Sequence, residues 1–426
     1  MVNDIEKYFD KLWPICRSIT GNGLRESFKI LQEIIPLKLE EIPTGTQVFD
    51  WVVPKEWNIN EAYIITPDGK KICDFKTNNL HIVNYSIPFN AEIDYEELVK
   101  HLNYIETLPD AIPYITSYYK ETWGFCITYN DFKTLSKVGK YKIVINSTLQ
   151  EGSLTYGECI LKGDSEKEVL FSTYLCHPSM ANNELSGPLV QAFLYQKIAA
   201  LPNRKYTYRF LFAPETIGVI AYLSRVGLHL KENLVAGYVL TCCGDAGNFV
   251  YKKSKQITSI SDIVALHVLK HQPIPYEVIP FSVGGSDERQ YCSSGFNLPV
   301  GSLTRSMYQH YKEYHTSLDN KDFISFDAMV KTIDTYFDFV KALEINEKYE
   351  NTIPFCEPQL GKRGLYPSSV NPTDSRKLIH DRMHFLSYAD GTKSLIEIAE
   401  LKNISVFDLE SHIQPLQSTG ILKVLR

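Results

Sequence analysis

The chain has 426 residues, of which 44% are apolar and 22% are charged, and its formal net charge is −6. This length exceeds what one hydrophobic core usually holds, and the composition excludes a disordered or fibrous protein. The charge balance argues against a chain-wide surface for nucleic acid or anionic membranes. There is no apolar stretch of membrane-spanning length and no secretory signal in residues 1–15, and the nine cysteines are scattered. We therefore expect a reduced, cytoplasmic protein that does not enter membranes.

The first third of the chain predicts helices followed by short strands. Residues 4–35 have a helical pattern interrupted near Pro14 and at Gly21–Gly23. From residue 42 to residue 85, short alternating segments are separated by turn residues, with Asp68-Gly69 as a candidate tight turn. A helix is expected at 95–105. We predict an inserted β-rich domain over residues 51–140.

Beyond residue 140, strands and helices alternate. Residues 140–149 and 154–163 read as two strands of a meander, and apolar runs predict buried strands at 168–175, 206–215, 234–243 and 298–303. Helical patterns are centred on residues 188–201, 216–227, 259–271 and 326–340. This alternation predicts a doubly wound, mostly parallel α/β sheet formed by residues 1–50 and 141–347. In such sheets the site lies beyond the carboxyl ends of the strands.

Residues 348–426 predict a linker followed by a winged-helix domain, with helices after residue 377, at 394–401 and at 406–416, and a strand at 421–425. Over 381–426 we count five basic and six acidic residues, which lacks the basic face of a DNA reader. We therefore expect no nucleic-acid partner. Docking or homo-oligomer formation is the expected role of this domain and of the inserted one.

Polar residues follow the predicted strands at their carboxyl ends. His177 comes after the strand at 168–175, Glu215 ends the next strand, and His315 follows the last one. Two neutral imidazoles and a carboxylate can hold zinc with one position open for water, while a second carboxylate moves the proton. The alternative for each histidine is a hydrogen-bonded structural role, which is the more common one beside a strand.

The motifs HPSMANNELSG, APETIG, GGSDERQ, FNLPVGSL and YHTSLDN occur in this order. The order resembles the zinc exopeptidases of the co-catalytic aminopeptidase type, which are related to glutaminyl cyclases and zinc carboxypeptidases. The chain is still more similar to a bacterial family of aminopeptidase-like proteins, in its N-terminal LWPICRSITGNGLRES, its inserted β-domain and its winged helix. The resemblance implies the doubly wound fold of the zinc exopeptidases.

When the metal ligands of the two-metal aminopeptidases are matched to positions of this chain, the resemblance implies one zinc ion instead of two. Asn183 stands where the two-metal enzymes have a bridging Asp, and Thr216 follows Glu215 where they have a second Glu. The two-metal enzymes have a further Asp at the end of the next strand. This chain has no Asp there, near Thr241, and Asp245 follows a few residues later.

What remains is His177, His315 and either Glu184 or Asn183, which resembles the His, Glu, His set of the zinc carboxypeptidases. We prefer Glu184 because a carboxylate binds zinc better than an amide. The orientation of these adjacent residues at a helix entry decides between them.

For the general base we choose Glu215, with Asp287 and Glu288 second. Asp287 has an alternative role, in which it only orients His315 or a loop. Cys176 is expected to be a core thiol.

Arg289 and Arg305 are candidates to bind a substrate carboxylate, and Arg25 is a further one. The alternative for each is a structural ion pair.

These residues predict a zinc-dependent hydrolase of amide or peptide bonds, amino- or carboxypeptidase-like, acting on a small peptide. Two alternatives stay open. One is a binding or scaffold protein that retains the fold without the chemistry. The other is hydrolysis of an N-acyl group on a sugar, because relatives resemble proteins of surface-polysaccharide or modified-sugar pathways.

Overall fold

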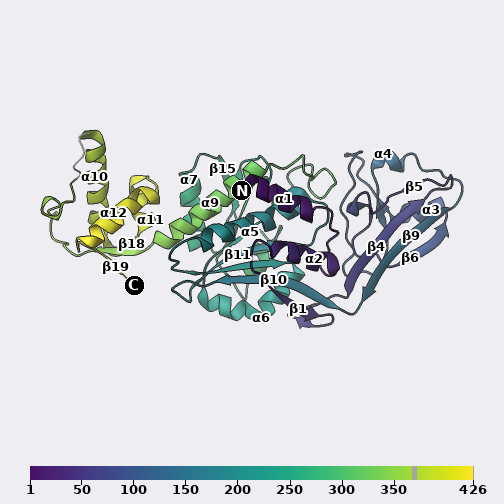
Figure 1. Cartoon of the computed structure of the whole chain (residues 1–426), viewed down its shortest axis with the longest axis horizontal. Coiled ribbons are helices and arrows are strands. Elements are labelled where there is room, and N and C mark those ends of the chain that lie inside the picture. The colour runs from purple at the N-terminus through teal and green to yellow at the C-terminus, as the bar shows by residue number, and fades with distance from the viewer. Residues whose placement is uncertain (367–371, 426) are drawn as a thin grey trace. The chain divides into compact units, whose positions relative to one another are not determined.

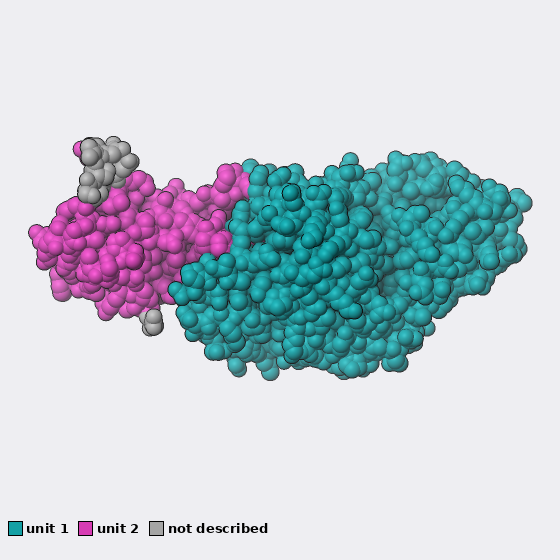
Figure 2. All heavy atoms as spheres, in the orientation of Figure 1, with its two compact units in different colours: residues 1–261, 275–334 teal, residues 262–274, 335–426 magenta. Residues whose placement is uncertain are grey.

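The computed structural model describes residues 1–366 and 372–425 (Figure 1). The chain divides into two compact units, residues 1–261 with 275–334 and residues 262–274 with 335–426 (Figure 2). The first unit holds the large sheet and the inserted domain, and the second holds the C-terminal domain.

The first unit is built on an eight-stranded sheet whose centre is parallel, as predicted. The four central strands run parallel and every side chain of three of them is buried, because helices cover both faces. The order of the strands is β1 (Lys38–Pro43), β10 (Ser153–Leu161), β12 (Thr207–Ala213), β11 (Glu168–Tyr174), β13 (Leu234–Val239), β16 (Val300–Thr304), β14 (Phe249–Lys252) and β15 (Tyr276–Ile279).

Helices pack on the two faces of this sheet (Figure 1). One face is covered by α1 (Val2–Leu12), α2 (Asn22–Leu31) and α5 (Ser186–Ala199), and the other by α6 (Ile217–Asn233). The short α8 (Glu288–Tyr291) packs against α6 and β16. A side chain on Gly187 would lie 2.4 Å from the Leu240 carbonyl oxygen, so only glycine lets α5 begin this close to the sheet. The predicted helices at 259–271 and 326–340 are confirmed as α7 (Ile260–Lys270) and α9 (Phe326–Ile345).

The inserted region forms a separate four-stranded antiparallel sheet, in the order β5 (Lys71–Ile72), β4 (Glu56–Ile65), β9 (Tyr141–Gln150), β6 (Phe89–Ile93). The predicted Asp68-Gly69 turn joins β4 to β5, with Gly69 at φ 85°. The meander prediction is wrong, because β9 pairs with β4 and β6 and not with β10. The helix expected at 95–105 ends early, as α3 (Tyr95–Leu98) and one 3₁₀ turn (Val99–His101) before β7 (Leu102–Asn103). The remaining elements are β2 (Gln47–Val48), β3 (Trp51–Val52), a 3₁₀ turn (Asn79–His81), β8 (Phe125–Cys126) and α4 (Tyr129–Phe132).

The C-terminal domain contains the predicted three helices and final strand, namely α10 (Pro372–Tyr388), α11 (Leu395–Lys402), α12 (Val406–Ser418) and β19 (Leu422–Leu425). A capping box of Ser394 and Glu397 begins α11. The expected linker begins with a strand, β17 (Lys348–Asn351), which pairs with β19 and with β18 (Asp390–Ser394). The rest of that linker includes a 3₁₀ turn (Gly361–Arg363) and residues 367–371, which, like Arg426, lie outside the described residues. Among the helices of 1–366 and 372–425, none is long and apolar enough to span a membrane.

Candidate active site

Strained backbone marks the carboxyl edge of the parallel strands. The loops that follow β11, β12, β13 and β16 each contain a non-glycine residue with positive φ, namely Ser179 (48°), Thr216 (62°), Cys242 (49°) and His315 (55°). Such conformations cost about 1–3 kcal/mol each and cluster at functional sites. These four positions lie at the edge where the predicted site residues fall, although positive φ also occurs elsewhere, as at Phe49 and Ile257.

His177 lies directly after β11 and is held by Glu184. Its Nδ1 lies 2.9 Å from Glu184 Oε2, while the other oxygen of Glu184 accepts the Cys176 N–H. Behind this pair, the guanidinium of the fully buried Arg17 lies 3.9 Å from Glu184 and donates to the His177 carbonyl at 3.3 Å. The Nε2 of His177 lies 3.6 Å from Glu215 Oε2. Glu184 thus holds one side of the imidazole and Glu215 lies beside the other.

A single turn of π-helix, Ala181–Leu185, gives Asn183 and Glu184 different directions. Asp319 fixes this turn by accepting the N–H groups of Asn182 (2.6 Å) and Asn183 (2.9 Å). The Asn183 amide donates to the Tyr174 hydroxyl at 2.9 Å. Of the two alternatives left by the sequence, Glu184 is the one that contacts His177.

His315 is held by a segment of the inserted domain. The Tyr114 N–H donates to the His315 carbonyl at 2.8 Å, and Ile112 exchanges backbone and side-chain hydrogen bonds with Ser317. The Tyr114 ring centroid lies 4.9 Å from that of His177 and 5.3 Å from that of His315. The two imidazole centroids are 5.4 Å apart. The inserted domain therefore positions a predicted ligand of the α/β domain.

Glu215 and Asp287 meet at the start of α6. Asp287 Oδ1 accepts the Thr216 N–H at 2.7 Å, and Arg289 donates to the Thr216 hydroxyl at 2.8 Å. The side chain of Glu215 is 26% exposed, whereas Asp287 is buried and its Oδ2 has no hydrogen-bond partner among the described residues. Asp287 and Arg289 thus fix the loop that carries Glu215.

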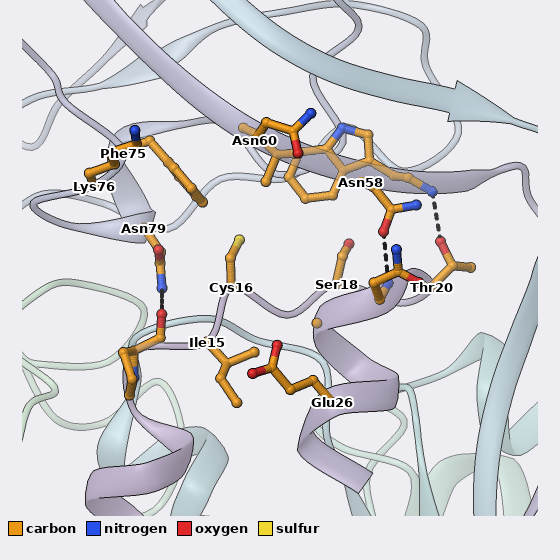
Figure 3. Close-up of a pocket in the computed structure, with 15 residues that line it drawn as sticks. Ile15, Cys16, Ser18, Thr20, Glu26, Asn58, Asn60, Phe75, Lys76 and Asn79 are labelled. Carbon is orange, nitrogen blue, oxygen red and sulfur yellow. Dashed lines mark hydrogen bonds between the residues drawn. The ribbon is translucent and has the colours of Figure 1, made fainter. Parts of the chain in front are cut away.

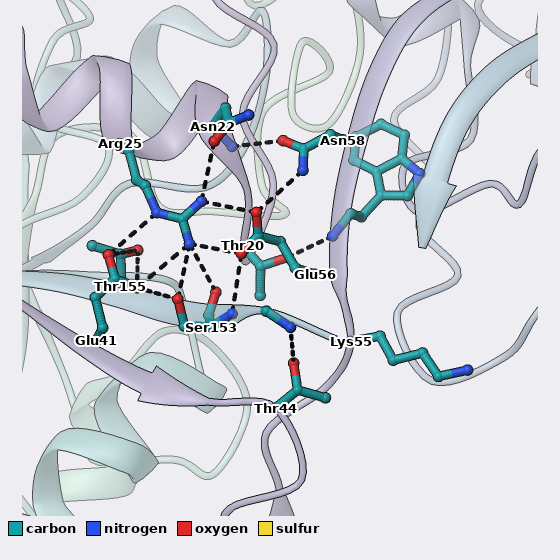
Figure 4. A network of polar contacts seen from close by, with 12 residues as sticks. Thr20, Asn22, Arg25, Glu41, Thr44, Lys55, Glu56, Asn58, Ser153 and Thr155 are labelled. Atoms are coloured by element: carbon teal, nitrogen blue, oxygen red, sulfur yellow. Dashed lines mark hydrogen bonds and ion pairs between the residues drawn. The ribbon is translucent and has the colours of Figure 1, made fainter. Parts of the chain in front are cut away.

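Three predicted residues have structural partners. Glu288 accepts from Lys252 at 2.7 Å, in a fully buried ion pair. Arg305 is 3% exposed and donates to Thr332 and to two backbone carbonyls, so the structure does not offer its guanidinium to a substrate. Arg25 joins Glu41 and Glu56 in a network at the root of the inserted domain (Figure 4).

Burial controls the protonation of the site. It lowers the pKa of His177 to about 3, with a further contribution from Arg17, and the pKa of His315 to about 3, with a contribution from His177. Both imidazoles are therefore neutral at pH 7, as metal ligands must be. Burial raises the pKa of Glu215, and Arg289 opposes this shift. Burial and the charge of Glu215 raise the pKa of Asp287.

The donor set fits a zinc ion. Glu184 occupies the Nδ1 side of His177, whereas on the other side its Nε2 lies 3.6 Å from Glu215 Oε2, and the neutral His315 ring lies 5.4 Å away between centroids. Imidazole and carboxylate groups of this kind are the usual zinc donors.

This fold and site define an aminopeptidase-like α/β protein. The chain is similar to a zinc aminopeptidase from Bacillus subtilis (TM-score 0.57, 11% identity, 80% of this chain and 94% of that chain). It is also similar to a peptidase M28 precursor from Shewanella amazonensis (TM-score 0.54, 12% identity, 80% and 92%). At these identities the likeness establishes the fold, and the predicted zinc-exopeptidase architecture is confirmed.

The chain belongs to the family described as "Domain of unknown function (DUF4910)", whose model matches residues 6–346. Residues 347–424 match a winged helix-turn-helix family, which confirms the predicted C-terminal domain. A protein of Clostridium acetobutylicum is 44% identical over 422 residues, 99% of this chain and 96% of that protein. Its name is "Putative polysaccharide biosynthesis protein with aminopeptidase-like domain", so the predicted aminopeptidase-like resemblance is confirmed. The crystal structure of a "putative peptidase" from that organism has a TM-score of 0.94 and 43% identity, covering 100% of this chain and 96% of that one.

Sequence reasoning missed three residues that shape the site, namely Arg17, Tyr114 and Asp319. Arg17 lies within the N-terminal motif that carried the resemblance, and this was its only signal. Asp319 lies in YHTSLDN, four residues after His315, but its partners are backbone groups of a distant turn. Nothing in the local pattern around Tyr114 distinguishes it from the other tyrosines of the insert.

Proposed function

We propose that this chain is a zinc-dependent hydrolase of amide bonds. One observation carries the proposal: the neutral His177 lies between Glu184 on its Nδ1 side and Glu215 on its Nε2 side, with the neutral His315 ring next to it. The likeness to zinc aminopeptidases supports it at the level of the fold.

His177 and His315 are the proposed zinc ligands, for one ion. The Nδ1 side of His177 is occupied by Glu184 and lies near the Arg17 guanidinium, so a cation is better placed on the Nε2 side. On this assignment, Glu184 acts as the carboxylate that orients a histidine ligand, instead of the ligand that the sequence favoured.

When bound, zinc lowers the pKa of a water molecule and polarises the amide carbonyl. Glu215 is the proposed general base: its raised pKa suits a group that takes a proton from water and returns it to the leaving nitrogen. Asp287 holds the Thr216 N–H and so fixes the base in place. Arg289 is the proposed contact for a substrate oxygen, because its side chain is partly exposed whereas that of Arg305 is buried.

The proposed substrate is a small peptide or an N-acyl compound. An N-acyl group on a sugar is the second candidate, because the name of the Clostridium acetobutylicum relative includes polysaccharide biosynthesis. All nine cysteines are free, which fits the proposed cytoplasmic location.

The test is turnover by the zinc-reconstituted full chain on aminoacyl anilides, blocked peptides and N-acetylated hexosamines. Glu215→Gln is expected to retain zinc and lower turnover by about 10²–10⁴-fold, the usual contribution of a general base. Glu92→Gln, an exposed change in β6, is the control and is expected to have wild-type activity. Zinc-loaded wild-type protein with no turnover on any of these substrates would favour the scaffold alternative.

A further inference from the structure

A cavity of about 550 Å³ is lined in part by the N-terminal motif LWPICRSITGNGLRES (Figure 3). The proposed function uses only Arg17 of this motif. The walls come from residues 14–26, from β4 at 57–60 and from 75–79, and His177, Glu215 and His315 are not among them. Cys16 and Ser18 line the cavity, whereas the intervening Arg17 does not and donates to the His177 carbonyl. The cavity is therefore distinct from the candidate active site, although one chain segment borders both.

The walls of this cavity are tightly built. A side chain on Gly23 would lie 1.8 Å from the Cys16 carbonyl oxygen, so only glycine allows α2 to begin here. The Trp57 N–H donates to the Thr20 hydroxyl at 3.0 Å, and the Asn22 N–H donates to the Asn58 side chain at 2.7 Å. These bonds join the N-terminal motif to the inserted sheet and fix the shape of the cavity.

Several polar groups of the lining have unused hydrogen-bonding capacity. Asn79 is 8% exposed and donates to the Pro14 carbonyl at 3.2 Å, while its Oδ1 has no partner among the described residues. Within the same part of the chain, the Glu26 carboxylate and the Asn60 amide have no side-chain hydrogen bond or ion pair. The Asn79 oxygen is therefore an acceptor that a ligand hydroxyl can reach from the cavity, and Glu26 and Asn60 add further polar groups to the same lining.

The charges of the lining argue against an anionic ligand, since Glu26 is a carboxylate without an ion pair. Lys76 is the one lining cation of the described residues, and its ammonium lies 3.9 Å from Glu61 with the side chain 63% exposed. An anion would therefore find no dedicated partner. Burial raises the pKa of Cys16 to about 12, so its thiol stays uncharged at pH 7.

The lining also has an apolar side. Figure 3 shows Phe75 beside the hollow, with Ile15 along its floor, among the amide and hydroxyl groups of the remaining walls. A ligand that suits this lining needs one apolar face and several groups that both donate and accept hydrogen bonds. Sugar rings have these properties, and 550 Å³ lies within the usual range of small-molecule sites.

We propose that this cavity binds a neutral saccharide, with its ring against Phe75 and its hydroxyls bonded to Asn79, Glu26 and Asn60. The site is separate from the proposed hydrolase site, so its occupancy is measured as binding and not as turnover.

The test is isothermal titration and saturation-transfer NMR on the full chain with glucose, galactose and N-acetylglucosamine. Glu26→Ala and Asn60→Ala change exposed side chains, so both variants are expected to fold. Each is expected to weaken binding by about tenfold, the effect of one lost hydrogen bond to a charged or polar group. Asn90→Ala, an exposed change in β6, is the matched control and is expected to bind like the wild type.

Saturable sugar binding that is weakened in both pocket variants and unchanged in Asn90→Ala supports the proposal. It is overturned if no sugar of the panel binds, or if binding is the same in all variants. Binding of glycylglycine or inorganic phosphate in place of sugar, sensitive to the same variants, would also overturn it.

Discussion

Tyr114 contacts both histidines from the inserted domain, so Tyr114→Ala is expected to weaken the site as well as the fold. The side chain is 7% exposed, and its hydroxyl lies 2.7 Å from that of Tyr118. The change keeps the Tyr114 N–H bond to His315 but removes the ring that packs beside both imidazoles.

The expected loss has two parts. Removing a buried aromatic side chain lowers the free energy of unfolding by about 3–5 kcal/mol. Loss of groups that orient metal ligands usually costs about 10–100-fold in metal affinity, and we expect about tenfold here because the backbone bond to His315 survives. Urea unfolding of the metal-free protein gives the first quantity, and competition with a chromophoric zinc chelator gives the second.

Tyr104→Ala is the matched control, because Tyr104 stacks on Phe132 in the insert, at a centroid distance of 4.1 Å. It is expected to lower stability and leave zinc affinity unchanged. Tyr114→Phe retains the ring and is expected to bind zinc like the wild type. A folded Tyr114→Ala variant with wild-type zinc affinity would refute the inference that the Tyr114 ring orients the two imidazoles.

Three further predictions concern single side chains. Glu184→Gln is expected to lower zinc affinity by about 10–100-fold, whereas His177→Ala should abolish binding; equal losses in the two variants would make Glu184 a ligand. Arg305→Met is expected to lower stability by about 2–4 kcal/mol, because its buried hydrogen bonds are lost, and to leave KM unchanged. A raised KM at unchanged stability would restore its substrate role. Arg25 holds the pKa of Glu56 at about 2, so this carboxylate stabilises the fold above its ordinary pKa of about 4.3, and the contribution disappears as the pH falls towards 2. Glu56→Gln should lower the free energy of unfolding by about 1–2 kcal/mol at pH 7, allowing for partial exposure, and the variant should lose less stability in acid than the wild type. The same loss of stability between pH 5 and pH 2 in both proteins would contradict this.

The buried strands could be predicted because their sequence pattern is strong. Strands β11 and β12 are continuous apolar runs, and both faces of each are covered. Strands β14 and β15 escaped prediction because they have four residues each, and three of the four side chains of β15 are exposed. The pairing of β9 could not be predicted, since its partner β4 lies far back in the chain and local alternation does not specify a partner.

The grouping of the candidate site residues could be predicted, but not their contacts with one another. The rule for carboxyl ends of parallel strands placed His177 and Glu215 correctly beside each other. The contact between Glu184 and His177 depends on a π-helical turn, and no sequence pattern specifies such a turn. Arg17 reaches His177 across 160 residues of sequence, which is tertiary information that the local pattern does not hold.

The metal content of the purified full chain tests the central claim most directly. We expect inductively coupled plasma mass spectrometry to find one zinc per chain in the wild type, and no zinc in His177→Ala and His315→Ala. His310→Ala, an exposed histidine in the same loop as His315, should retain the ion. A wild-type protein that takes up no zinc, or histidine variants that bind zinc like the wild type, would contradict the account.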